Sequence, residues 1–191
     1  NETELEKRGI QHAFGAPVTG AISVSESIAV CFGDGNVRFF RPHHDHTTVK
    51  AHEGVILCVD AHEDHIITGG DDGRFLKISV DGKVEEIANF NSKWVDCVAA
   101  KDGISVCSSG SSVYIWSNDH IEPTILKHSS TVGGLAFDKI GKRLAVAHYG
   151  GTTIWEKGDR RWKSKKLIWK GFHGAVTFSP DGKYVVTAMQ E

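Results

Sequence analysis

The pentapeptide Ser112-Val113-Tyr114-Ile115-Trp116 carries the pattern that decides the fold. Its residues are mostly β-branched or aromatic, which favours a strand, and it ends in a large apolar side chain. Three further segments share this design and end in Phe40, Ile78 and Trp155. Successive end residues are separated by 38, 38 and 39 positions. The chain therefore repeats one supersecondary unit with a period of about 38 residues.

A second apolar run precedes each of these segments at an equivalent distance. These runs are Ser27–Cys31, Ile66–Thr68, Ile104–Cys107 and Arg143–Ala147. A fifth copy begins with Val176–Val186 and has no third run. Asp-Gly pairs such as Asp72-Gly73 lie between many of the runs, and this dipeptide favours tight hairpin turns. Each unit is thus a set of short strands joined by turns.

The composition agrees with an all-β protein. The 191 residues include 18 Val and 15 Ile but only 7 Leu, together with 21 Gly and 4 Pro. β-Branched residues favour strands and glycines supply turns. The net charge of −2 argues against an overall basic nucleic-acid binder. Apolar runs stay well short of the roughly 18 residues that a membrane span needs, so we expect no membrane contact.

These repeats resemble the WD-repeat β-propeller family over residues 12–191. The resemblance implies an all-β fold, a β-propeller of four-stranded antiparallel blades, with four blades plus part of a fifth in this chain. We expect blades at residues 18–54, 55–94, 95–131 and 132–174, a truncated fifth at 175–191, and a latch strand within 1–17.

The resemblance also assigns structural residues. Trp116 and Trp155 occupy the position of the family's tryptophan, and Asp34 and Asp72 occupy that of its turn aspartate. In the family a His, a Ser or Thr, the turn Asp and the Trp can form a buried hydrogen-bonded set. Here only His52, Thr68 and Asp72 are expected to approximate it, without the Trp.

The fifth copy breaks off soon after the run Tyr184–Thr187, and we therefore expect the chain to be a fragment. An incomplete ring would expose apolar blade faces, which something else should cover. Two partners fit: the remainder of the same propeller as a second fragment, or a second copy of this chain. The interrupted repeat favours the remainder.

The cysteines follow the repeat. Cys31 and Cys107 each lie 9 residues before the end of the third run, and Cys58 and Cys97 lie 20 and 19 residues before it. Because they fall into two equivalent strand positions, we expect them to be buried as small apolar residues. A disulfide or metal role is the alternative.

Two histidine-rich segments raise a metal hypothesis. They are His43-His44-Asp45-His46 and His62-Glu63-Asp64-His65. Adjacent residues of an extended strand point to opposite faces, so at most two histidines of the first segment share a face. Two ligands make a weak site, and we expect no metal site and no cofactor.

The stretch Lys157–Lys170 is strongly basic and contains Trp162 and Trp169. A basic patch with aromatic residues can bind phosphates and stack bases. Its position is that of a blade's outer strand, where lysines usually face solvent and protect an edge. A solvated edge is therefore the first interpretation, a protein contact the second, and nucleic acid or acidic lipid the third.

WD-repeat propellers commonly bind partners on one rim of the ring. The positions that the resemblance places on this rim are Trp94, Asp71, Ser109, Thr131 and His148. An exposed tryptophan among polar neighbours is a typical interface anchor, which singles out Trp94. We expect this rim to bind an unknown protein or peptide.

Nothing in the sequence suggests catalysis, because it contains no GxSxG, HExxH or phosphate-loop motif. We therefore expect a non-catalytic, cytoplasmic protein-interaction scaffold. One alternative is a nucleic-acid-associated adaptor that uses the basic strand at residues 157–170. The other is a metal-dependent propeller enzyme.

Overall fold

The computed structural model describes residues 4, 9–42, 45–117, 122–159 and 161–190. In this part of the chain the regular elements are strands, β1 to β16, which form four antiparallel sheets of four strands. Because the repeat units are rich in β-branched residues and separated by glycine turns, each unit folds as a hairpin meander. The expected all-β class and four-stranded antiparallel blades are both observed.

The first two sheets are regular meanders. The first contains β1 (Val18–Val24), β2 (Ser27–Phe32), β3 (Asn36–Phe40) and β4 (Thr47–Lys50). The second contains β5 (Ile56–His62), β6 (His65–Gly70), β7 (Arg74–Ser79) and β8 (Val84–Asn89).

The last two sheets follow the same strand order. The third contains β9 (Cys97–Lys101), β10 (Ile104–Ser109), β11 (Ser112–Ser117) and β12 (Thr124–Lys127). The fourth contains β13 (Val132–Phe137), β14 (Arg143–Lys157), β15 (Trp162–Phe178) and β16 (Val185–Gln190).

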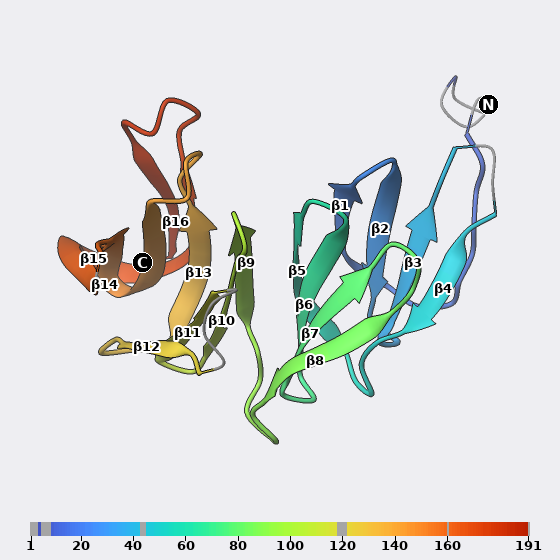
Figure 1. Ribbon diagram of the computed structural model, residues 1–191, viewed down its shortest axis with the longest axis horizontal. Helices are drawn as coiled ribbons and strands as arrows, with labels where there is room; N and C mark the ends of the chain where they lie inside the picture. Colours follow the sequence, from blue (N-terminus) through green and yellow to red (C-terminus); the bar gives the residue numbers. More distant parts are fainter. Residues whose placement is uncertain (1–3, 5–8, 43–44, 118–121, 160, 191) are drawn as a thin grey trace.

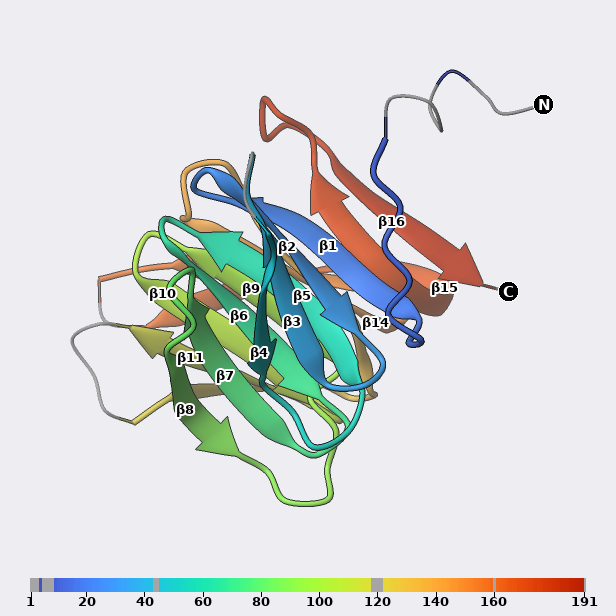
Figure 2. The ribbon, with the colours of Figure 1, turned by 90° about the vertical axis from the view of Figure 1, so that its right-hand side faces the viewer.

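The sheets stand side by side in the order of the sequence (Figure 1). Neighbouring sheets meet through their first strands: β1 contacts β5, β5 contacts β9, and β9 contacts β13. Figure 2 looks toward the first sheet, which forms one side of the molecule with the other sheets behind it. First strands that line a common axis, with the later strands radiating outward, are the arrangement of a β-propeller.

The fourth sheet contains more than one repeat unit. β14 is long because it includes both the second and the third strand of its unit. β15 pairs with β14 over Trp162–Ile168 and again at Phe172, and it pairs with β16 over Phe172–Phe178. The second half of β15 also contacts β13, just as β5 contacts β1. The fifth unit is therefore a half-blade, made of the end of β15 and of β16, and it continues from the outer strand of the fourth unit.

Two glycines show why the turns between second and third strands are fixed. Gly35 and Gly73 have φ values of +77° and +78°, which L-residues with a Cβ rarely adopt. A Cβ added to Gly35 would lie 2.1 Å from the carbonyl oxygen of His52. The turn thus requires glycine both for its backbone angles and for its close approach to the neighbouring loop.

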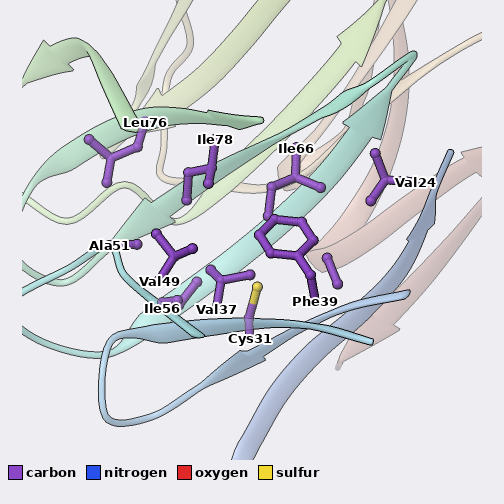
Figure 3. Packing of buried hydrophobic residues seen from close by; sticks show 11 residues of the cluster. Val24, Cys31, Val37, Phe39, Val49, Ala51, Ile56, Ile66, Leu76 and Ile78 are labelled. Atoms are coloured by element: carbon purple, nitrogen blue, oxygen red, sulfur yellow. The ribbon is translucent and has the colours of Figure 1, made fainter. Parts of the chain in front are cut away.

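The core lies between adjacent sheets. Between the first and second sheets, Phe39, Cys31 and Val37 pack against Ile66 and Leu76 (Figure 3). Two further clusters fill the spaces between the next pairs of sheets. The apolar side chains of each unit are thus buried only when a neighbouring unit is present, as in other repeat proteins.

All four cysteines are free thiols, and their side chains lie in or against these clusters. Burial raises the pKa of Cys31 to about 12 and that of Cys97 to about 11. It also raises the pKa of Cys58 and of Cys107. The cysteines therefore act as apolar packing residues, as their repeat positions predict.

Residues 9–17 cross the outward face of the first sheet. The ring of Phe14 lies 5.4 Å from that of Phe32 and 6.1 Å from that of Phe40. The Arg38 guanidinium sits 4.4 Å from the centre of the Phe14 ring and 4.2 Å from that of Phe32. This segment is not a strand where the structure describes it, and the expected latch within residues 1–17 stays a prediction.

None of the described segments forms a helix of the length and apolarity that a membrane crossing requires.

Candidate functional site

One rim of the molecule gathers two kinds of loop. In each four-stranded meander, the turn between the second and third strands lies at the same end as the loop that enters the next sheet. Hydrogen bonds join the two: Val55 N donates to Asp71 Oδ1, and Val95 N donates to the Gly70 carbonyl. We call this end the loop rim. In Figure 1 it is the lower edge, where the connection from β8 to β9 protrudes.

Trp94 is the most prominent side chain that the sequence predicted for this rim. It is 57% exposed, while its neighbour Val95 is fully buried. The backbone on either side is held, because Lys93 N donates to the Phe90 carbonyl and Val95 N to the Gly70 carbonyl. A rigidly presented, exposed indole is suited to anchor a protein partner.

The other predicted rim residues differ in how accessible they are. Thr131 is exposed, and Asp71 is half-buried with its carboxylate accepting a hydrogen bond from Val55 N. Ser109 and His148 are buried instead. His148 lies 2.9 Å from the Thr153 hydroxyl and 2.9 Å from the Tyr149 carbonyl, so its ring supports the hairpin. Ser109 and His148 therefore depart from the expectation, since neither side chain is exposed on the rim.

Tyr149 is a rim residue that the sequence reasoning missed. It is 55% exposed, and its backbone N donates to the Ser130 hydroxyl of the adjoining loop. A cavity of about 710 Å³ lies beside it, lined also by Trp169, Lys170, Phe172 and Met189. The loss of the turn aspartate at this position, where the repeat carries Tyr149 instead, was the signal that could have revealed it.

The expected structural set is assembled in the second unit. His52 lies between Thr68 and Asp72, with its Nε2 2.9 Å from the Thr68 hydroxyl and its Nδ1 2.9 Å from Asp72 Oδ1. Burial lowers the pKa of His52 despite the neighbouring carboxylate. Burial alone would raise the pKa of Asp72, but hydrogen bonds from His52 and from two backbone N–H groups outweigh it and lower the pKa. These hydrogen bonds hold the loop that enters β5 against the turn between β6 and β7.

The other structural candidates have separate roles. Asp34 accepts a hydrogen bond from Asn36 N and pairs with Arg38 at 3.1 Å. Trp155 Nε1 donates to His128 Nε2 at 3.0 Å. The Trp116 ring packs against that of Phe75, with centroids 5.4 Å apart. The tryptophans thus support the interfaces between neighbouring sheets.

The basic stretch is an exposed edge. Lys163, Lys165, Lys166 and Lys170 lie on β15 and are exposed, while Arg160 lies outside the described residues. Trp162 packs against the core beside Trp155, and Trp169 is 67% exposed. Only one of the two tryptophans is therefore available for stacking, which weakens the nucleic-acid interpretation.

The histidine-rich segments do not assemble a metal centre in the described parts of the chain, where no group of three or more candidate ligands is found. His43 and His44 lie outside those parts. His46 stacks on Phe40, with ring centroids 5.4 Å apart. His62 Nε2 accepts a hydrogen bond from Asp102 N, and His65 lies 3.1 Å from Asp64.

Comparisons with known proteins agree with this architecture. The family model described as "WD domain, G-beta repeat" matches residues 44–76. A chain in the structure described as "Crystal Structure of Mitotic Checkpoint Complex" superposes with a TM-score of 0.75 at 14% sequence identity. The match covers 90% of the present chain and 60% of the solved one. A comparison with curated proteins finds no match.

The fold and its loop rim define a β-propeller built from repeats of about 38 residues. The family match identifies a WD repeat across the first and second sheets, which confirms the resemblance to WD-repeat propellers. The present chain spans 60% of the matched solved chain.

Proposed function

We propose that this chain is a non-catalytic scaffold that binds a protein or peptide partner on its loop rim. The observation that carries the proposal is the exposure of Trp94 on a rim whose backbone is held by hydrogen bonds. Aromatic anchors on rigid surfaces supply much of the free energy of protein association. The matched solved chain, which comes from a multiprotein complex, supports protein partners in general.

The acidic side chains of the turns support the absence of catalysis. Asp34, Asp72 and Asp138 each accept hydrogen bonds from backbone N–H groups of their own turns. These bonds, together with side-chain hydrogen bonds from Arg38, His52 and Arg143 respectively, lower the pKa of each carboxyl although burial opposes them. Carboxylates committed to turn geometry and held ionised are poorly suited to act as general acids.

Quantitative pull-down with the 191-residue chain tests the rim. We expect Trp94→Ala to reduce recovery of a rim-binding partner by at least about tenfold, because loss of an anchor costs roughly 2 kcal/mol. Ile140→Ala is the matched control, since Ile140 is 63% exposed in the turn between β13 and β14, at the opposite rim. Equal recovery of every partner by Trp94→Ala and by the control would remove Trp94 from the binding surface.

We propose further that the two flanks of the array are covered in the working protein. The candidates are the remainder of the same propeller as a second fragment, or a second copy. Large apolar side chains that are exposed on β15 and β16 support this proposal, among them Ile168, Trp169 and Val186. Native mass spectrometry distinguishes the candidates, since a copy doubles the mass whereas a fragment adds a different one; a lone monomer contradicts both.

A cytoplasmic location is the last part of the proposal. The four free cysteines support it, since cysteines in secreted proteins are commonly paired as disulfides.

A further inference from the structure

The second and third sheets meet at a junction on the loop rim, where the connection from β8 to β9 protrudes (Figure 1). Val95 N of this connection donates to the Gly70 carbonyl of β6, and Asp96 N donates to the Ser108 carbonyl of β10. Both sheets have a further neighbour, because β5 contacts β1 and β9 contacts β13. The junction is therefore built only from sheets that the structure contains in full. We call it the Trp94 junction and define it by Asp71, Trp94, Asp96 and Ser109.

The Trp94 junction carries negative charge that is not compensated. The loop segments around it are residues 51–55, 70–73 and 90–96. They contain one cation, Lys93, and four carboxylates, Glu53, Asp71, Asp72 and Asp96. Asp71 and Asp96 have no ion-pair partner in the part of the chain that the structure describes. The junction therefore attracts a cationic group.

The carboxylate of Asp71 is held at a fixed place. Its Oδ1 accepts a hydrogen bond from Val55 N at 2.8 Å, whereas its Oδ2 has no hydrogen-bond partner among the described residues. A Cβ added to Gly54 would lie 1.9 Å from Asp71 Oδ1, so the loop that enters β5 closes tightly over this side chain. One oxygen of a fixed carboxylate thus remains available to a donor from a partner.

Asp96 is half-buried between the two sheets. Burial raises the pKa of its carboxyl. Burial also raises the pKa of Cys58 on β5 and of Cys97 on β9, and the charge of Asp96 adds to both effects. Asp96 therefore lies close to the first strands of both sheets. Because burial disfavours an ionised carboxylate, a cationic group placed here would stabilise it.

A buried hydroxyl at the junction also lacks a partner. Ser109 is 7% exposed, and its Oγ has no hydrogen-bond partner among the described residues. Ser109 is the last residue of β10, and the alternation of a strand places its side chain on the face of Cys107, toward the second sheet. Buried polar atoms are nearly always hydrogen-bonded, so this unsatisfied hydroxyl indicates a missing ligand.

We propose that the Trp94 junction binds an arginine side chain of a partner polypeptide. The guanidinium stacks on the exposed indole of Trp94 and donates hydrogen bonds to Asp71 and Asp96, while its remaining N–H donors face the Ser109 hydroxyl. This inference rests on the proposed scaffold function and names the chemistry by which the rim recognises its partner. Guanidinium groups stack on aromatic rings and bind carboxylates through paired hydrogen bonds.

The junction suits a guanidinium better than other cations. A metal ion needs several ligands at short range, and no group of three or more candidate ligands is found where the structure describes the chain. A lysine ammonium is compact and strongly hydrated, whereas a guanidinium is flat, weakly hydrated and rich in donors. An exposed indole flanked by two carboxylates therefore favours arginine.

Two-dimensional ¹H–¹⁵N NMR of the 191-residue chain tests the inference through the indole N–H signal of Trp94, which is assigned by its loss in Trp94→Phe. The probe is a short glycine-serine peptide with blocked ends and one central arginine. Two matched peptides carry lysine or citrulline instead, and citrulline has the shape of arginine without its charge. We expect the arginine peptide to shift the Trp94 signal saturably and the lysine peptide to bind at least about fivefold more weakly. The citrulline peptide should leave the signal in place.

Asp71→Asn/Asp96→Asn tests the carboxylates. We expect it to weaken binding of the arginine peptide about tenfold or more, because it removes both charges and keeps the size of each side chain and the acceptor for Val55 N. The indole signals of Trp116 and Trp155, which pack between sheets, report that the variant is folded. Glu85→Gln, a charge removal at an exposed position of β8, is the control and should bind as the unmodified chain does.

Equal shifts with the arginine and citrulline peptides, or equal binding by Asp71→Asn/Asp96→Asn and Glu85→Gln, would overturn the proposal. The scaffold function is read separately by pull-down. If Trp94→Ala loses a partner that Asp71→Asn/Asp96→Asn retains, the scaffold function stands and arginine recognition fails.

Discussion

Equivalent histidines occupy buried or half-buried positions in three units, yet they have different partners. His52 is bonded to Thr68 and Asp72, His173 lies 2.9 Å from the Thr187 hydroxyl, and His128 accepts a hydrogen bond from Trp155. The three rings lie at equivalent positions of the repeat pattern. The pattern could not predict their partners, because the fourth unit carries Tyr149 in place of the turn aspartate and the His148 ring lies beside His128 instead.

His128 makes the stability of the chain sensitive to acid. Burial, with a smaller effect from His148, lowers the pKa of His128 to about 4, below its ordinary value of 6.5. Its Nε2 accepts the Trp155 proton and its Nδ1 is buried without a partner among the described residues. The unfolded chain binds a proton on this histidine near pH 6.5, whereas the folded chain binds it only near pH 4. The free energy of unfolding is therefore highest above pH 6.5 and falls as the pH is lowered toward 4.

We expect His128→Gln to reduce this pH dependence. Glutamine keeps an acceptor for Trp155 but cannot be protonated, so up to about 1.4 kcal/mol per pH unit of acid destabilisation disappears between pH 6.5 and 4. Urea unfolding at several pH values measures the slope. His65→Gln is the control, because His65 is the first residue of β6 and lies next to the exposed Asp64. An unchanged slope in His128→Gln would show that other groups dominate acid unfolding.

At the scale of elements, the repeat period predicted where most strands lie. It did not predict that β14 and β15 each join two strands of the repeat into one. Runs ending at Phe40, Ile78 and Trp116 became separate third strands, as expected. β14 and β15 instead continue through Gly151 and Gly171, whose φ values are +135° and +116°. The dipeptide Gly150-Gly151 signals a turn, whereas Gly171 stands alone, and such φ values favour glycine at both bends. The predicted exposure of His148 on the rim was wrong for a different reason. Neighbouring residues of a strand point to opposite faces, so an error of one position exchanges the exposed and the buried side chain. His148 is consequently buried and Tyr149 exposed.

Asp60 joins two neighbouring elements and was not identified from the sequence. It stands on β5 where the first unit has Ile22, and its Oδ2 accepts a hydrogen bond from Ala100 N of β9 at 2.8 Å. Its Oδ1 accepts one from Ala61 N, also at 2.8 Å. Burial raises the pKa of this carboxyl. First strands of neighbouring sheets are not otherwise paired as a ladder, so this carboxylate links two sheets directly.

We expect Asp60→Ala to lower the free energy of unfolding by about 1–3 kcal/mol, because it leaves Ala100 N without its acceptor at the contact between the sheets. Urea denaturation measures the change. Glu85→Ala, at an exposed position of β8, should stay within about 0.5 kcal/mol of the unmodified chain. Equal stability of Asp60→Ala and Glu85→Ala would show that the link contributes nothing.

At the scale of the whole molecule, stability depends on contacts between neighbouring units. The sequence predicted this property through its repeat, since one unit cannot bury both of its faces alone. The first sheet packs against one neighbouring sheet, whereas the second and third have a neighbour on each side. Units at the end of an array open more easily than those within it.

Thiol labelling can follow this opening. We expect all four cysteines to react slowly in the folded chain at pH 8, because burial raises the pKa of each thiol, and to react fully in strong urea. In urea below the unfolding midpoint, Cys31 of the first sheet should be labelled before Cys58, Cys97 and Cys107. Peptide mapping by mass spectrometry reads the order. Simultaneous labelling of all four would indicate that the chain unfolds as one cooperative body.

The continuity of β15 has a mechanical consequence. Loops connect the first three sheets to their successors, and such loops are where proteins hinge and where proteases cut. The fourth unit passes into the half-blade through a strand of 17 residues, with no loop between them. These two units therefore share one continuous strand, which bends at Gly171. Because no loop separates them, we expect a displacement of the half-blade to move the outer strand of the fourth unit with it.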